Sequence, residues 1–214
     1  MNEKIYLHTI NNGFSDYYIP KKQREVLENI LKSDKILSKR MQGLNENNTI
    51  LNFCGLDYIS LSDYEKRFVS NREKYHYNGY YAYVRNGLSL TFPQDKIDVI
   101  EPIIIGVCTK TSRDFEYMSL LGMDKENRYT DLPDEVQVKD SLSLDNLNGI
   151  LFPTENFMHS KILTKKSKML KLLKEELIIL RDILDKYEKD VLIYDVDTLE
   201  ELNSENAEDF ALKL

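Results

Sequence analysis

The order of β-favouring and helical stretches limits this chain to few fold classes. Short stretches rich in β-branched and aromatic residues are scattered along it, and apolar residues at helical spacing fill only some of the intervals between them. A doubly wound parallel sheet would need a helix in nearly every interval. The pattern therefore predicts an α+β fold with a mixed sheet. The expected strands are 4–10, 56–62, 87–92, 99–108, 135–139, 149–153 and 191–196.

Two helices are expected from the spacing of apolar residues, and a short tyrosine-rich helix is expected at 75–86. The first begins near Pro20, which suits the first turn of a helix, and continues through Leu31. The second is long, from about 160 to 187, and we expect its leucine stripe to pack against the sheet or to pair with a partner helix. The stripe consists of Leu170, Leu173, Leu177, Leu180 and Leu184. The acidic segment that follows is expected to be an exposed helix or disordered.

Length and charge narrow the class of protein. The 214 residues suggest one domain with an appendage, which we divide into a domain at 1–158 and a C-terminal helix with an acidic tail at 159–214. The formal net charge of −7 weighs against a large nucleic-acid footprint, because phosphate contacts need basic residues. The sequence shows no secretory segment and no apolar run long enough for a membrane span, so we expect a cytoplasmic protein.

Cysteine and histidine usage predicts no metal site. The two cysteines, Cys54 and Cys108, are far apart and form no CxxC pair, which also makes a disulfide framework unexpected. The three histidines show no metal-ligand spacing. Gly-rich phosphate loops of the GxGxxG and GxxxxGK[ST] types do not occur either.

Three polar or aromatic residues lie in or beside stretches that are expected to be buried strands. They are His8 in "YLHTI", Tyr58 in "GLDYISLS" and Glu135 in "PDEVQVK". Each has a common structural explanation. Histidine often serves a structural role, tyrosine favours strands, and a glutamate at the start of a strand is usually solvated. No one of the three indicates a function by itself.

The order of these residues resembles the ADP-ribosyltransferase superfamily, in the branch with a His…Tyr…Glu triad. That branch includes diphtheria-toxin-like and poly-ADP-ribose-polymerase-like enzymes and DNA-modifying toxin enzymes. The resemblance covers roughly 4–152. It rests on an early strand with the histidine, on "GLDYISLS", on "GLSLTF", and on "DEVQVKDSLSLDNLNGILF". It implies a split mixed sheet of ADP-ribosyltransferase type, to which the long C-terminal helix would be an extension.

The resemblance also implies a site and a substrate. Glu135 would be the catalytic residue that stabilises the ribose oxocarbenium ion formed when NAD loses nicotinamide. Tyr58 would stack on the nicotinamide ring, a contact with a cation–π component. His8 and Thr9 would bind NAD, and Ser60 would line the pocket. NAD would be a substrate.

The expected function is mono-ADP-ribosyl transfer, a glycosyltransferase reaction, from NAD to a macromolecular acceptor. The negative charge favours a protein acceptor, while nucleic acid remains an alternative. A second hypothesis is a non-catalytic module that keeps this fold and binds a protein partner, as an inhibitor would.

The chain departs from the family pattern at His8-Thr9-Ile10, where poly-ADP-ribose-polymerase-like members have His-Gly-Ser/Thr. The register at His8 therefore stays open by one or two residues. Arginines for NAD phosphate and residues for acceptor recognition are further candidates. They are Arg40, Arg85, Arg128, Tyr129, Asp131 and the tyrosine cluster Tyr75, Tyr77, Tyr80, Tyr81 and Tyr83, for which solvated or packing roles are more common.

Overall fold

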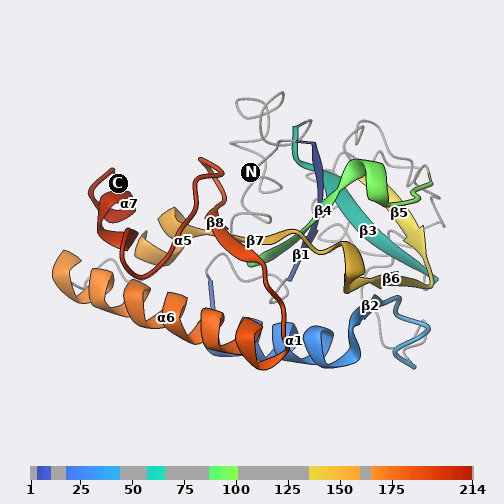
Figure 1. The fold of residues 1–214 in the computed structure, drawn as a ribbon, viewed down its shortest axis with the longest axis horizontal. Coiled ribbons are helices and arrows are strands. Elements are labelled where there is room, and N and C mark those ends of the chain that lie inside the picture. The colour runs from blue at the N-terminus through green and yellow to red at the C-terminus, as the bar shows by residue number, and fades with distance from the viewer. Residues whose placement is uncertain are drawn as a thin grey trace, which may run out of the picture.

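A computed structural model describes residues 4–10, 18–43, 57–65, 87–100, 135–159 and 165–213. The strands are β1 (Ile5–Thr9), β2 (Lys35–Leu37), β3 (Tyr58–Asp63), β4 (Ser89–Pro93), β5 (Glu135–Lys139), β6 (Ser141–Ser143), β7 (Gly149–Phe152) and β8 (Leu192–Asp195). The helices are α1 (Pro20–Ser33), α5 (Thr154–His159), α6 (Lys166–Lys186) and α7 (Ala207–Lys213), with short 3-10 turns η3 (Gln94–Lys96) and η4 (Leu144–Asn146). Figure 1 shows their arrangement.

The main sheet is mixed and mostly antiparallel, as the scattered strands predict. Its six strands within the described residues have the order β5-β3-β1-β4-β7-β8, and β2 and β6 form a separate two-stranded sheet. Among the described strands of the main sheet, β7 and β8 are the one pair that runs parallel. The connection from β7 to β8 contains α5 and α6, because a parallel pair needs a long crossover. The split of the sheet in the ADP-ribosyltransferase manner stays a prediction.

Helices α1 and α6 cover one face of this sheet (Figure 1). Helix α1 starts at Pro20, as expected, and buries Leu27 and Leu31, while Val26 is 37% exposed. It ends at Asp34, whose left-handed backbone (φ 54) lets its N–H donate to the Leu31 carbonyl. We call the sheet face that packs on these helices the helix-side face.

Helix α6 packs on the sheet of its own chain, which is the first of the two arrangements expected for its leucine stripe. Its buried residues recur every three or four positions and join one core with the sheet. They are Met169, Leu173, Glu176, Leu177, Leu180, Ile183 and Leu184. The expected helix is therefore confirmed over 166–186, and residues 160–164 lie outside the described ones.

A charged residue of α6 is buried among the apolar ones and joins three segments. The Glu176 carboxylate accepts from the Tyr18 hydroxyl (2.9 Å) and is paired with Arg24 of α1. Burial raises the pKa of Glu176 and raises that of Tyr18 well above its usual value. The Tyr18 ring also packs on Phe152 and Phe157. Because a buried carboxylate needs such partners, this network fixes α1 against α6.

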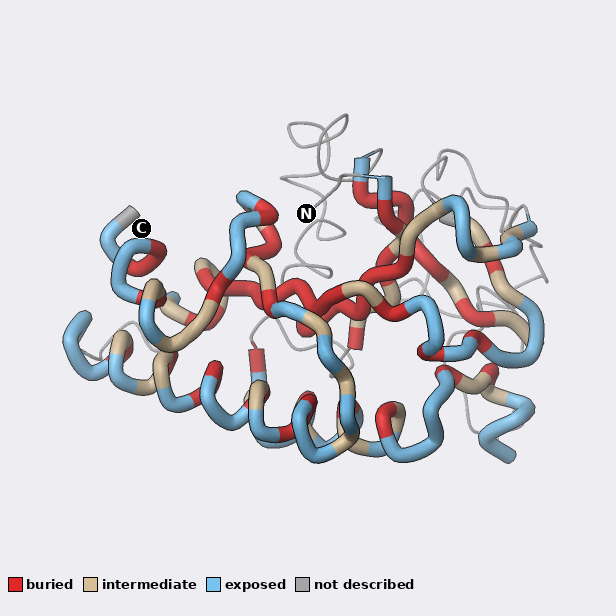
Figure 2. The backbone as a smooth tube through the Cα atoms, in the orientation of Figure 1, coloured by how far each residue is buried: buried red, intermediate tan, exposed pale blue. Residues whose placement is uncertain are grey.

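The C-terminal segment is part of the fold, contrary to the expectation of an exposed or disordered tail. Val196, Leu202, Ala207 and Phe210 are all buried, and Figure 2 shows red segments between the exposed turns. Strand β8 forms the edge of the main sheet beside β7. The apolar residues of the C-terminal segment are interspersed with many carboxylates, so the sequence pattern did not indicate that they are buried. Residues on both sides of 158/159 belong to one core cluster, and the division of the chain at that point stays a prediction.

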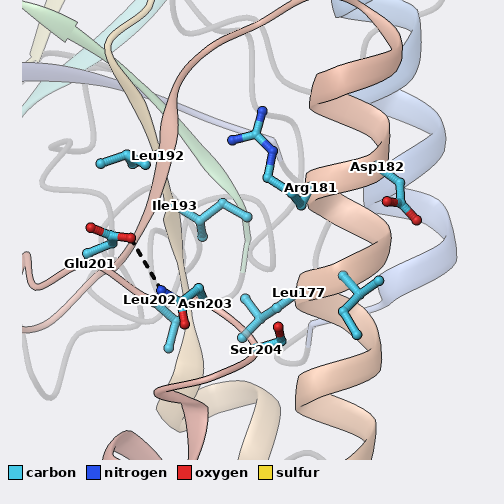
Figure 3. A pocket seen from close by; sticks show the side chains of 10 residues that line it. Leu177, Arg181, Asp182, Leu192, Ile193, Glu201, Leu202, Asn203 and Ser204 are labelled. Carbon is cyan, nitrogen blue, oxygen red and sulfur yellow. Dashed lines mark hydrogen bonds between the residues drawn. The ribbon is translucent and has the colours of Figure 1, made fainter.

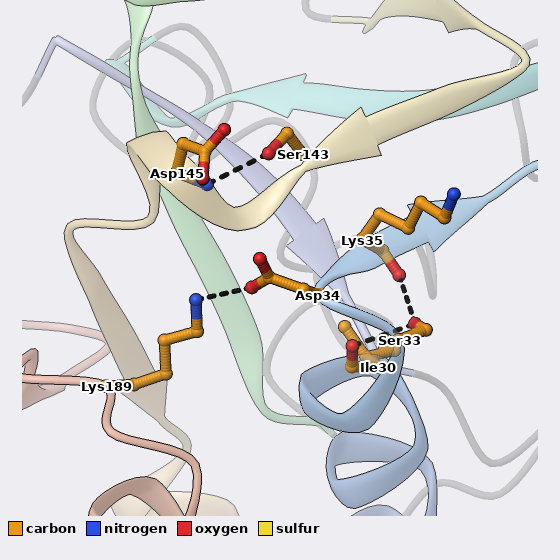
Figure 4. A network of polar contacts seen from close by, with 7 residues as sticks. All are labelled: Ile30, Ser33, Asp34, Lys35, Ser143, Asp145 and Lys189. Atoms are coloured by element: carbon orange, nitrogen blue, oxygen red, sulfur yellow. Dashed lines mark hydrogen bonds and ion pairs between the residues drawn. The ribbon is translucent and has the colours of Figure 1, made fainter.

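Polar contacts hold the two small strands and the end of α6 together. Asp34 pairs with Lys189, which follows α6, and the Ser33 hydroxyl donates to the Ile30 or the Lys35 carbonyl (2.9 and 2.7 Å; Figure 4). Ser143 Oγ accepts from Asp145 N (3.1 Å) and starts the short turn η4. These contacts lie where the β2–β6 pair meets the ends of α1 and α6.

Candidate functional site

Strand β3 carries two of the predicted site residues on one of its faces. Tyr58, Ser60 and Ser62 alternate with Ile59 and Leu61, which are buried in the helix-side core. Because side chains alternate along a strand, the two serines and Tyr58 share the face away from the helices. We call this second sheet face the hydroxyl face.

Strand β5 places Glu135 beside the same positions. In the register, Ser62 lies opposite Glu135, Ser60 opposite Gln137, and Tyr58 opposite Lys139. Residues directly opposite each other share a sheet face, so the position of Glu135 belongs to the hydroxyl face. Along β3, the Glu135 and Tyr58 positions are four residues apart, or about 13 Å.

Strand β5 is held on both of its edges near its middle. One edge pairs with β3, and on the other Ile100 and Gln137 exchange two backbone hydrogen bonds of 2.9 and 3.0 Å. The Gln137 residue is fully buried. Paired backbone on both edges fixes the strand two residues from Glu135.

Strand β1 contributes Thr9 to the hydroxyl face. Leu7 lies opposite Ser62 of β3, and Thr9 lies opposite Ser89 of β4. The Thr9 Oγ1 and Ser89 Oγ atoms form a hydrogen bond of 2.8 Å. The pairing of β1 with β3 covers Tyr6 and Leu7, and Thr9 lies two residues beyond Leu7 on the same face of β1.

His8 occupies the opposite face of the sheet. It lies opposite Leu90 of β4, which is fully buried in the helix-side core. Its Nδ1 is 3.3 Å from the backbone carbonyl oxygen of Ser60. Burial lowers the pKa of His8, and the Ser60 carbonyl opposes that shift by favouring the protonated ring. The structure therefore groups Thr9, Tyr58, Ser60 and Glu135 but separates His8 from them.

Several buried polar residues of the hydroxyl face were missed by the sequence analysis. Ser89, Thr91 and Gln137 are fully buried, and Ser62 is nearly so. Thr91 donates its hydroxyl hydrogen to the Asn148 Oδ1 or the Gly149 carbonyl, at 2.6 and 2.9 Å. A usable signal was present, because "SLTF" and "EVQVK" alternate polar and apolar residues as a strand with one polar face does.

A small apolar cluster covers part of the hydroxyl face. Ile5 and Leu7 of β1 pack with Leu151 of β7, with Tyr64 after β3 and with the segment after β8. Tyr64 also donates its hydroxyl hydrogen to the Val196 carbonyl (3.1 Å). The polar positions around Thr9 and Ser60 lie beside this cluster, farther along the same strands.

Other candidates are placed differently or lie outside the described residues. Arg40 is paired with Asp57, one residue before Tyr58. Arg85, Arg128, Tyr129, Asp131 and the tyrosine cluster Tyr75–Tyr83 lie outside the described residues. Within the described ranges, no group of three His, Cys, Asp or Glu residues is arranged to hold a metal ion. In the same ranges, no helix has the length and apolar character that crossing a bilayer requires.

Comparisons with known proteins give one structural likeness. No family model matches the sequence, and no curated protein matches it. The structure of Thermus sp. 2.9 DarT in complex with NAD+ is similar at a TM-score of 0.40 and 11% identity, over 88% of this chain and 92% of that chain. A TM-score of this size does not place two chains in one fold, so the residues of this chain carry the functional proposal.

Proposed function

We propose that this protein is an NAD-dependent mono-ADP-ribosyltransferase that transfers ADP-ribose to a macromolecular acceptor. One observation carries the proposal. Four residues that the sequence resemblance selects, Thr9, Tyr58, Ser60 and Glu135, come from three strands and occupy one sheet face. Tyr58 and Ser60 share a face because they are two positions apart on β3, and the register of β5 adds Glu135 to that face, while His8, the fifth selected residue, lies on the other.

The geometry suits a substrate that extends along the strands. Tyr58 and Glu135 lie about 13 Å apart along β3 and β5, with Ser60 between them. In the proposed complex, Tyr58 stacks on the nicotinamide ring and the Glu135 carboxylate binds the adjoining ribose near its 2′-hydroxyl. Ser60 and Thr9 supply further hydroxyl groups on the same sheet face. Thr9 takes the role that the sequence resemblance divided between His8 and Thr9.

The proposed reaction exchanges one bond at the ribose. The bond from ribose C1′ to the nicotinamide nitrogen breaks, and its electron pair leaves with neutral nicotinamide. The developing oxocarbenium charge is stabilised by the fixed Glu135 carboxylate. A nucleophilic atom of the acceptor then bonds to C1′, and its proton passes to Glu135 or to water.

The acceptor is proposed to be a protein. The net charge of −7 disfavours a large phosphate-binding surface, because each phosphate contact needs a basic partner. An assay with separate protein and DNA acceptors distinguishes this choice from the nucleic-acid alternative without affecting the assignment of Glu135.

The test is the substitution Glu135→Gln, assayed with NAD that is labelled on its adenylate phosphate. We expect release of nicotinamide and labelling of the acceptor to fall by about 100- to 1000-fold, the usual cost of removing one electrostatic group at a transition state. The matched control is Glu25→Gln, an exposed carboxylate of α1, which should keep wild-type rates. Circular dichroism should show both variants folded.

Two outcomes would contradict the proposal. Wild-type rates in the Glu135→Gln variant would remove Glu135 from the site. A wild-type protein that neither consumes NAD nor labels any acceptor would favour the non-catalytic binding module instead.

A further inference from the structure

A second concave site lies at the other edge of the sheet from Glu135. The pocket has a volume of about 180 Å³ and lies between α6, β8 and the segment at 201–204 (Figure 3). We call it the C-terminal pocket. It is separated from β5 by five strand spacings, or about 24 Å, so it belongs to a different part of the molecule from the proposed NAD site.

The C-terminal pocket has an apolar floor that continues to an exposed apolar edge. Leu177, Ile193 and Leu202 are buried beneath it. Ile178 and Leu192, which also line it, are 48% and 44% exposed. Large aliphatic side chains left half in water beside a concavity are typical of a surface that binds another apolar group.

Carboxylates give the rim of this pocket a negative charge. Asp182 of α6 and Glu201 of the facing segment both line it, and Figure 3 shows the Asp182 carboxylate on the outer side of α6. Arg181 also lines the pocket, but its guanidinium is already engaged by Asp185 and by the Lys189 and Val191 carbonyls, at 2.6 to 2.8 Å. A ligand therefore meets the two rim carboxylates rather than a free arginine charge.

The wall formed by 201–204 is ordered before any ligand binds. Asn203 Oδ1 accepts from the Glu205 and Asn206 backbone N–H groups, both at 3.0 Å, and Asn206 Oδ1 accepts from Asn203 N at 2.8 Å. Asn203 Nδ2 also donates to Glu201 Oε1 (3.3 Å; Figure 3). These reciprocal contacts form the turn that leads into α7 and hold the Glu201 side of the pocket in place.

Backbone groups on the outer edge of β8 are already hydrogen-bonded within the chain, so a ligand cannot bind there as an added strand. The Ile193 carbonyl accepts from Leu202 N (2.8 Å), and Asp195 N donates to the Glu200 carbonyl (3.0 Å). The Val191 carbonyl accepts from Arg181. A ligand at the C-terminal pocket must therefore bind through side chains.

We propose that the C-terminal pocket binds a peptide segment of a protein partner, in which one aliphatic side chain is flanked by lysine or arginine. The volume suits one such side chain and is smaller than the roughly 300 Å³ at which pockets for whole small molecules begin. The flanking cations complement Asp182 and Glu201. The same carboxylates repel phosphate, which excludes a nucleotide or nucleic acid.

The probe is the pentapeptide acetyl-Gly-Lys-Leu-Lys-Gly-amide, titrated into protein that carries ¹³C-labelled Ile and Leu methyl groups. We expect saturable shifts of the Ile178 and Leu192 methyl signals at up to about 5 mM peptide, several times the dissociation constant expected for one anchored side chain. Matched peptides with serine in place of leucine, or with glutamates in place of the lysines, should bind at least several-fold more weakly.

Two pairs of double variants test the pocket residues. Ile178→Ser with Leu192→Ser should weaken peptide binding about tenfold, whereas Ile179→Ser with Leu212→Ser, at exposed positions outside the pocket, should not. Asp182→Asn with Glu201→Gln should weaken binding roughly threefold to tenfold at low salt, and less at high salt because salt screens exposed charges. NAD turnover should be unchanged in all of them, since the site is remote from Glu135.

Four results would overturn the proposal. The first three are no methyl shift at any peptide concentration, equal binding of the serine peptide, and an equal loss of peptide binding in the Ile179 and Leu212 control. The fourth is a methyl shift that depends on protein concentration without peptide, which would show that a second copy of the chain occupies the pocket. Each of them leaves the Glu135 assay unaffected, so the two proposals fail independently.

Discussion

The two faces of the main sheet are built from the same strands but differ in chemistry. On the helix-side face, Ile59, Leu61 and Leu90 pack into one apolar core with α1 and α6. On the hydroxyl face, the alternate residues of the same strands include Ser60, Ser62, Ser89 and Thr91. An apolar face such as the helix-side face is what a sheet needs in order to pack against helices.

The difference teaches that the hydroxyl face is not explained by packing alone. Burial of a hydroxyl group without a partner costs free energy, and an apolar residue would serve the core at least as well. Thr9, Ser89 and Thr91 are hydrogen-bonded instead. These hydrogen bonds allow the chain to keep polar groups on the part of this face that lies beside Thr9.

The largest effect that separates the faces should be on stability. Leu61→Ala on β3 removes a fully buried side chain from the helix-side core, and we expect the free energy of unfolding to fall by about 2–5 kcal/mol. Ser60→Ala, the neighbouring residue on the other face, should cost less than about 1 kcal/mol. Urea unfolding of the two variants measures both. Equal losses would show that the hydroxyl face is also a packing surface.

The next effect should appear in NAD binding. Tyr58→Ala removes the proposed stacking contact, whose cation–π part contributes about 0.5–2 kcal/mol, so the KM for NAD should rise by about 2- to 30-fold. Tyr58→Phe keeps the ring and should retain most of the affinity. If both variants matched the wild-type KM, Tyr58 would not contact the nicotinamide ring.

Adjacent residues of β1 give the sharpest comparison of the two faces. Thr9→Val removes the hydroxyl that bonds Ser89 on the hydroxyl face, and we expect a loss of about 1 kcal/mol in NAD binding, or about fivefold in KM. His8→Asn changes the helix-side face and should leave KM unchanged. The opposite result would return the NAD-binding role to His8 and shift the register of the site by one residue.

The smallest effect concerns pH. Because the pKa of His8 is lowered in the folded chain, the unfolded chain takes up the proton first as pH falls below about 6.5, and the free energy of unfolding falls with it. The slope from this group is at most about 1.4 kcal/mol per pH unit. His8→Asn should remove that part of the slope between about pH 7 and pH 5.5.

The pKa shift of Glu176 has the opposite effect on the pH dependence of stability. Its pKa is raised in the folded chain, so its contribution to stability falls as pH rises above the ordinary glutamate value. The two groups therefore change stability in opposite directions on acidification. A His8→Asn variant that became more sensitive to acid than the wild type would contradict the lowered pKa of His8.

Much of the fold was accessible from the sequence, because local patterns encode it. Alternation in "KIYLHTI" and "EVQVK", Pro20 before an apolar repeat, and the leucine stripe of α6 each predict an element that the structure contains. The packing of 196–211 was not accessible, since its few apolar residues are masked by carboxylates and are buried only because α6 and β8 lie beside them.

The sequence by itself determined which strands exist and which of their residues alternate, because those properties depend on neighbouring residues along the chain. Only the tertiary structure decided which positions meet. The pairing of β3 with β1 and β5 joins residues more than fifty positions apart, and a shift of one residue would exchange the faces of every side chain. That register, which local patterns do not specify, brings Thr9 and Glu135 to the face of Tyr58 and leaves His8 on the other.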